Sequence, residues 1–176
     1  MTGPGERAGA DGRALSHVGA DGRLRMVDVG DKPVTSRKAA ASGNIRMRRE
    51  SLALIATTSV AKGDVVATAR IAGVMAAKRT AELIPLCHPL SLDDVQVVVE
   101  LDDTLPGVRV AVEVRTHGRT GAEMEALTAA SVTLLTIYDM MKATDREMVI
   151  GDIVLDRKSG GTSGEYSRLD GTGPAR

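Results

Sequence analysis

The chain has 176 residues, of which 43% are hydrophobic, so it can bury the core of one domain of ordinary size. It contains two tyrosines, no phenylalanine and no tryptophan, which argues against binding of nucleic acid by base stacking. Its 23 basic residues balance 23 acidic ones, so it has no overall positive field that would attract nucleic acid or an anionic membrane surface. One cysteine excludes an intramolecular disulfide, and no apolar run reaches the roughly 20 residues that a membrane helix requires.

The first 24 residues are rich in Gly, Ala, Asp and Arg and show no apolar periodicity. We expect residues 1–24 to be a flexible tail in which His17 has no function, followed by a single domain over residues 25–164 and a second flexible tail over 165–176. Because the N-terminal stretch lacks the continuous apolar segment of a secretory signal, we expect a cytoplasmic protein.

Residues 36–48 alternate in short patches that predict an extended edge strand. Arg37 projects from this strand, either as a solvated arginine or as a phosphate ligand. A short helix is predicted over residues 50–56 and a longer one over residues 64–83, which Pro85 ends. One face of the longer helix is made of small residues that would let another backbone come close, namely Ala69, Ala72, Gly73, Ala76 and Ala77.

Two lysines flank this longer helix. Lys78 lies in its last turns, where a positive charge suits the helix dipole. Lys62 precedes the helix, at the end that disfavours a positive charge, so we regard Lys62 as the better candidate for a ligand.

The segment LIPLCHPL places Cys87 and His88 between two prolines, in a rigid loop. Adjacent residues of an extended loop point to opposite sides, which disfavours a Cys–His nucleophile pair, and one cysteine with three histidines shows none of the usual zinc spacings. We therefore expect no metal site. Cys87 is predicted to be a buried thiol, whereas His88 could bind substrate or titrate near neutral pH.

Two alternating stretches, residues 92–103 and 107–118, enclose a Pro-Gly turn and predict a β-hairpin with one face in water. A long helix within residues 118–145 follows, and then a strand over 148–157 that runs into a glycine-rich tail containing Lys158. The resulting order βαββαβ predicts an α+β fold of the ferredoxin-like class, with an antiparallel sheet and helices packed on one face.

The long helix has an apolar side that should face the core, made of Ala126, Leu127, Ala130, Leu134, Ile137 and Met141. Gly121, with Thr120 as a candidate N-cap, leaves the first N–H groups of the helix available to an anion.

Ionisable residues lie at both ends of this helix. Glu125 and Asp139 are separated by about 21 Å of rise and by only about 40° around the axis. Two explanations are open: the two ends serve different tasks, or two copies of the chain bring opposite ends together, which we favour. A plainer interpretation is that Glu123 and Glu125 complement the helix dipole while Asp139 and Lys142 form an exposed ion pair.

Three segments carry a resemblance to a known family: KGDVVATARIAGVMAAKRTAELIPLCHPL, GRTGAEMEALTAASVTLLTIYDMMKA and KSGG. From residue 26 to 164 the chain resembles the cyclic pyranopterin monophosphate synthases of molybdenum cofactor biosynthesis. The resemblance implies a lyase that converts (8S)-3′,8-cyclo-7,8-dihydroguanosine 5′-triphosphate to cyclic pyranopterin monophosphate and releases diphosphate. It further implies a homohexamer, a trimer of dimers with active sites at subunit interfaces, and no cofactor, apart from Mg²⁺ on the substrate phosphates, which the sequence leaves open.

The same resemblance assigns roles to single residues. It implies that four are catalytic: Asp139, Lys142, Lys62 and Lys158. It implies that eight bind substrate: Leu86, Cys87, His88, Glu123, Met124, Glu125, Arg37 and Lys78. The family often has a cysteine where Met141 stands, which is an apolar position with no catalytic consequence.

These residue types suit the reaction. Rebuilding a purine as a pterin needs several proton transfers, which Asp139 and Lys142 could perform, and cations such as Lys62 and Lys158 could hold the triphosphate. Two alternatives stay open. A nucleotide hydrolase or cyclohydrolase on the same fold would release phosphate or formate, and a non-enzymatic binding or oligomerisation module would bind without turnover.

Overall fold

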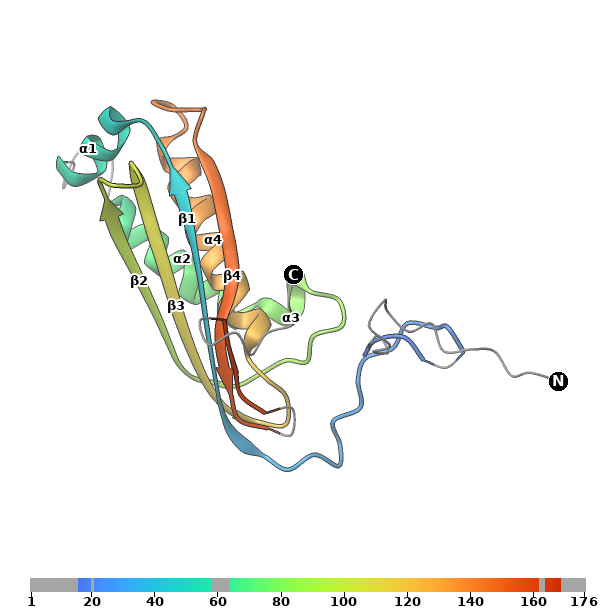
Figure 1. The fold of residues 1–176 in the computed structure, drawn as a ribbon. Helices are drawn as coiled ribbons and strands as arrows, with labels where there is room; N and C mark the ends of the chain where they lie inside the picture. Colours follow the sequence, from blue (N-terminus) through green and yellow to red (C-terminus); the bar gives the residue numbers. More distant parts are fainter. Residues whose placement is uncertain (1–15, 20, 58–63, 162–163, 169–176) are drawn as a thin grey trace.

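The computed structural model describes residues 16–19, 21–57, 64–161 and 164–168. Lys62, one of the predicted catalytic residues, lies outside them, as do residues 1–15 and 169–176 of the two predicted tails. Figure 1 shows one twisted sheet with helices behind it and an N-terminal segment that stands away from the sheet. No helix among the described residues is long and apolar enough to cross a membrane.

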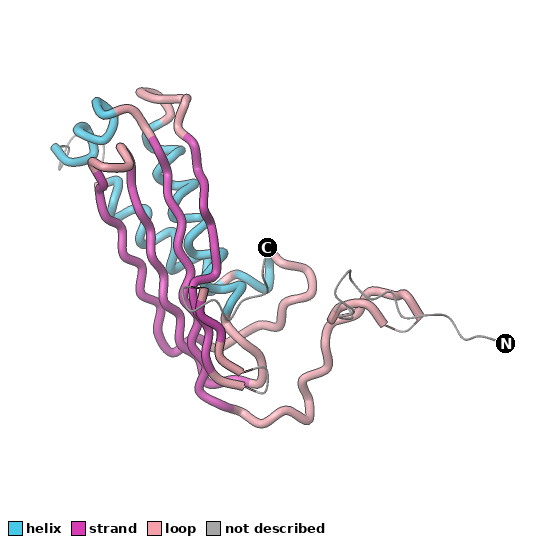
Figure 2. Tube along the Cα trace, in the orientation of Figure 1, coloured by secondary structure: helices cyan, strands magenta, loops and turns pink. Residues whose placement is uncertain are grey.

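The sheet has five strands in the order β2-β3-β1-β4-β5, and each neighbouring pair is antiparallel. Figure 2 shows the strands as one layer. Their bounds are β1 Thr35–Arg46, β2 Leu92–Asp102, β3 Gly107–Gly118, β4 Val149–Ser159 and β5 Tyr166–Ser167. The predicted hairpin over residues 92–118 is thus confirmed, whereas Tyr166–Ser167, which the sequence assigned to the C-terminal tail, pair with β4.

The prediction that residues 36–48 form an edge strand was wrong, because β1 lies between β3 and β4. Its inward residues are small: Ala39 and Ala41 are each 1% exposed, and a Cβ on Gly43 would come within 2.8 Å of the Leu134 side chain. Small residues let a helix lie close to a central strand, but they carry a weak local signal of burial. The edge assignment failed for that reason.

The helices are α1 Arg49–Thr57, α2 Val65–Lys78, α3 Thr80–Leu83 and α4 Glu123–Met141. Figure 1 shows α2 and α4 side by side behind the same face of the sheet. A Cβ on Gly73 of α2 would overlap the hydroxyl of Thr133 on α4, so the small-residue face does allow the close approach that the sequence predicted. The single helix predicted over residues 64–83 is interrupted at Arg79 (φ −113°, ψ 13°), and its second part ends before Pro85, as predicted.

Helix α4 buries most of the predicted face, since Ala126, Ala130, Leu134 and Ile137 have no exposed surface, whereas Leu127 is only partly buried. Its N-terminus differs from the prediction: Ala122, not Thr120, holds the N-cap position, and no side chain caps it. The first N–H groups of α4 are therefore left for other partners.

Candidate active site

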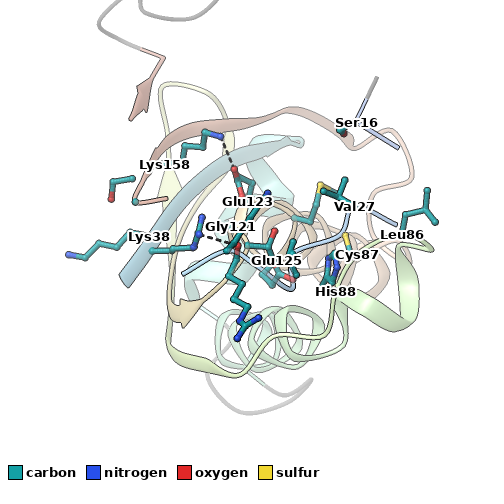
Figure 3. A pocket seen from close by; sticks show the side chains of 18 of the residues that line it. Ser16, Val27, Lys38, Leu86, Cys87, His88, Gly121, Glu123, Glu125 and Lys158 are labelled. Atoms are coloured by element: carbon teal, nitrogen blue, oxygen red, sulfur yellow. Dashed lines mark hydrogen bonds and ion pairs between the residues drawn. The ribbon is translucent and has the colours of Figure 1, made fainter. Parts of the chain in front are cut away.

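A cavity of about 450 Å³ lies where β1 begins, β3 leads into α4 and β4 ends, and its volume is in the range of small-molecule sites. Eight of the predicted site residues line it: Arg37, Leu86, Cys87, His88, Glu123, Met124, Glu125 and Lys158. Figure 3 shows Lys158 and Glu123 on one side of the cavity and Leu86, Cys87 and His88 on the other. The fold thus gathers residues from four separate segments of the chain.

The cationic side of the cavity is made by the last residues of β4 and the first turn of α4. Lys158 lies within β4, not in a flexible tail, and its Nζ donates to Oε1 of Glu123 at 3.0 Å. Glu123 folds back over Gly121, where a Cβ would overlap its carboxylate. The carboxylate therefore occupies the approach to the helix N-terminus, at which we expected an anion.

Arg37 is buried at 7% exposure and ties three segments together. Its Nε donates to the carbonyl of Gly118 at 2.9 Å and its Nη2 to that of Arg119 at 3.1 Å, which holds the loop that enters α4. The chain after β4 passes directly against the guanidinium, because Gly161 (φ 81°) has no Cβ to overlap it. A solvated strand arginine is therefore the wrong interpretation of Arg37.

Glu125 is the deepest ionisable group of the cavity. The residue is 3% exposed, and its Oε2 has no hydrogen-bond partner. Burial raises the pKa of Glu125 to about 7, an effect that its own backbone N–H opposes and the charge of Glu123 reinforces. Burial also raises the pKa of the Cys87 thiol, as does the nearby Glu125 carboxylate. The partly buried Cys87 is thus suited to packing rather than to attack as a thiolate.

Lys78 lies outside the main cavity. It lines a smaller cavity of about 110 Å³, whose lining also includes Pro89, Leu90 and Glu125. In this chain Lys78 is therefore not a part of the main cavity wall.

Asp139 and Lys142 lie at the opposite end of α4 from the cavity. Lys142 Nζ donates to Asp139 Oδ1 at 2.6 Å, and the two side chains are 56% and 70% exposed. The spacing argument from the sequence is confirmed in this respect, because one chain does not bring Asp139 and Glu125 into one site. No three His, Cys, Asp or Glu side chains of the described residues gather into a group that could hold a metal ion.

The sequence reasoning missed several residues that line the cavity, among them His17, Val27 and Lys38. His17 belongs to the predicted N-terminal tail, yet its stretch forms a tight turn in which Val18 and Leu24 make a β-bridge. A local signal for this turn exists: the dipeptide at Asp21 and Gly22, flanked by apolar residues, is typical of a hairpin turn.

Comparisons with known proteins show the family of this chain. A sequence model described as the MoaC family matches residues 26–161. A protein of Brucella ovis named cyclic pyranopterin monophosphate synthase is 59% identical over 156 residues, which cover 89% of this chain and 94% of the relative. A protein of Brucella canis with the same name is 58% identical over the same length and the same shares. The chain belongs to the MoaC family.

Proposed function

We propose that this protein is a cyclic pyranopterin monophosphate synthase, a lyase of molybdenum cofactor biosynthesis. It converts (8S)-3′,8-cyclo-7,8-dihydroguanosine 5′-triphosphate to cyclic pyranopterin monophosphate and releases diphosphate. The observation that carries the proposal is the cavity, which has cations and a helix N-terminus on one side and a buried carboxyl among neutral side chains on the other. Such a cavity suits a nucleotide with a triphosphate at one end and a base at the other.

The triphosphate is proposed to bind at Lys158, Arg37 and the N-terminus of α4. Closure of the cyclic phosphate needs a ribose-derived hydroxyl to attack the α-phosphorus while diphosphate leaves, and fixed positive charge stabilises both the attack and the departure. Glu123 must give up Lys158 for this to happen, because the two now form an ion pair. Mg²⁺ on the phosphates is compatible with this arrangement, and no resident cofactor is proposed.

The base is proposed to lie at the other side of the cavity, against Leu86, Met124 and His88. The guanine-derived ring presents N–H donors, and the partnerless Oε2 of Glu125 is an acceptor placed in the wall of the same cavity. A buried acceptor without a hydrogen-bond partner in the protein gains one when such a ring binds, which favours binding.

The proton transfers are assigned to Asp139 and Lys142 of a second subunit, together with Lys62, within a homohexamer built as a trimer of dimers. Support comes from the outer surface of the helix layer. Ile71, Met75 and Leu135 are 62%, 48% and 56% exposed there, which is large for apolar side chains on adjacent helices. Leu135 is four residues from Asp139 and therefore on the same face of α4. A partner that covers this apolar surface would also reach Asp139.

The fold is proposed to be ferredoxin-like, because the order β2-β3-β1-β4 with crossover helices fits the split βαβ pattern, and β5 is an addition at its edge. Cytoplasmic location is proposed on the family resemblance alone, since the substrate derives from GTP.

The test is a turnover assay with the purified protein and the cyclised dihydro-GTP, with and without EDTA. We expect diphosphate and a pterin of the mass of cyclic pyranopterin monophosphate in equal amounts. Lys158→Ala should be impaired, whereas Arg157→Ala, which removes the same charge from the next residue of β4, should not. Release of formate or inorganic phosphate would identify a cyclohydrolase or hydrolase instead, and tight binding without products would identify a binding module.

A further inference from the structure

The N-terminal residues 16–19 and 21–29, here called the arm, form a folded element with its own hydrogen bonds. Gly19 N donates to Arg23 O at 2.9 Å, Arg25 N donates to His17 O at 3.0 Å, and the imidazole Nδ1 of His17 lies 3.3 Å from Arg25 O. Gly22, with φ 76°, makes the turn between them. Figure 1 shows that the arm leaves the start of β1 and stands on the side of the loop between α3 and β2.

The arm forms one wall of the cavity. Ser16, His17 and Val27 line it together with Leu86 and Cys87 of the loop after α3. Figure 3 places Ser16 and Val27 on the side of Leu86, away from Lys158 and Lys38. The arm therefore adds Val27 to the neutral side of the cavity, and His17, which follows Ser16 in the chain, lines the same cavity.

Hydrogen bonds connect the end of the arm to the loop that enters α4. Nη1 of Arg119 donates to the carbonyl of Gly30, just after the arm, and Arg37 holds the backbone carbonyl of the same Arg119. Figure 1 shows the arm standing away from the sheet, so these hydrogen bonds tie it to the entry of α4 rather than to a strand.

We infer that the arm is the outer wall of the base end of the site and that His17 is a further substrate-contacting residue. This inference rests on the proposed function, which puts a nucleotide in the cavity. A wall at that place holds the ring against Leu86 and keeps bulk water from it while the ring is rebuilt.

The three histidines of the chain allow a direct test in the full-length protein. His17 and His88 line the cavity, whereas His117 lies on β3 beside Asp93, 2.7 Å from its carboxylate, and serves as the internal control. The imidazole NMR signals are followed while GTP is added, and in a second titration while inorganic triphosphate is added. GTP carries the triphosphate of the substrate and the guanine from which the base of the substrate derives. We expect GTP to shift the signals of His17 and His88 but not of His117, and triphosphate to leave His17 unchanged.

The outcomes separate the two proposals. A shift of His88 without His17 would overturn the role of the arm and leave the proposed function standing. An equal response of His17 to triphosphate would overturn its assignment to the base end. If calorimetry shows that GTP binds but the signals of both His17 and His88 stay unchanged, the nucleotide does not bind in this cavity. That result would overturn both the placement of the proposed site and the inference about the arm.

Variants give a second measurement. His17→Ala and Val27→Ala should each weaken GTP binding by about three- to tenfold, because each loses one contact with the base, while the affinity for inorganic triphosphate stays the same. Leu24→Ala is the matched control, since Leu24 lies in the same turn, is 75% exposed and does not line the cavity. Wild-type GTP affinity in both test variants would overturn the inference.

Discussion

Lys158 Nζ lies 3.0 Å from Oε1 of Glu123, inside the cavity and beside the N-terminus of α4. The ion pair occupies the place where the proposed triphosphate would bind. An incoming phosphate must therefore replace the carboxylate as the partner of the lysine, and the free energy of that exchange enters the substrate affinity.

The first prediction follows from this competition. Lys158→Ala should weaken the binding of inorganic triphosphate, with a smaller salt dependence than the wild-type protein shows, because one attractive charge is lost. Glu123→Gln should tighten the same binding, because it removes a repelling charge and frees the ammonium group. Calorimetry at two salt concentrations measures both effects, with Arg157→Ala as the control for a lost charge on β4. Equal affinities in the two variants would exclude competition at this site.

The second prediction concerns Glu125 and pH. Its pKa is raised from an ordinary 4.5 to about 7, so the folded chain holds this proton more tightly than the unfolded chain does. The free energy of unfolding should therefore fall as pH rises from about 4.5 to about 7 and stay lower above that range, by up to roughly 3 kcal/mol. Glu125→Gln carries no such proton. Its melting temperature relative to wild type should rise between pH 5 and pH 8, and parallel curves would contradict the raised pKa.

The third prediction uses the single cysteine as a reporter of the same carboxyl. Burial first, and then the charge of Glu125, raise the pKa of Cys87, so its alkylation by iodoacetamide should be slow at pH 8. Glu125→Gln removes the second cause and should move the pH profile of alkylation to lower pH. Mass spectrometry of the intact protein measures this without ambiguity, because no other thiol is present. An unchanged profile would mean that the two side chains do not interact.

The sequence alone supported the sheet order only partly. Alternation and a Pro-Gly turn predicted the β2–β3 hairpin, since both signals are local. The neighbours of β1 depend on pairing between residues far apart in sequence, as between Arg37 and Thr116 on β3 or between Lys38 and Ser159 on β4, and no local pattern carries that information. The central position of β1 could not be predicted for this reason.

The site shows the same division. Helical spacing correctly placed Glu125 and Asp139 at opposite ends of one helix, because that distance depends only on the helix geometry. The burial of Arg37 was missed, because it depends on two loop carbonyls and on Gly161, which are distant in sequence. His17 was missed because a turn signal in a glycine-rich stretch was interpreted as a tail.

The fourth prediction concerns Asp139 and Lys142 as one proton-transfer unit. Their ion pair is exposed, so its loss should change the free energy of unfolding by less than about 1 kcal/mol. Turnover should respond differently: Asp139→Asn and Lys142→Ala should each lower the single-turnover rate by about 100- to 10,000-fold, and the double variant should be hardly slower than either. Asp94→Asn is the control, since it breaks another exposed pair, with Arg115. Near-normal rates in the single variants would show that the pair is only a surface interaction.

The last prediction tests whether two subunits share one site. Because α4 keeps Glu125 in the cavity and Asp139 exposed at its far end, a site that uses both residues needs them from different chains. Chains with Glu125→Ala and chains with Asp139→Ala, each inactive alone, are co-expressed with different tags and isolated as mixed assemblies. With random mixing, each chain at a shared site has an even chance of supplying its intact residue, so about a quarter of the sites should be complete and about a quarter of the wild-type activity should return. If every site instead took both residues from one chain, no mixture could contain a complete site, and mixed assemblies that form but remain inactive would contradict the shared arrangement.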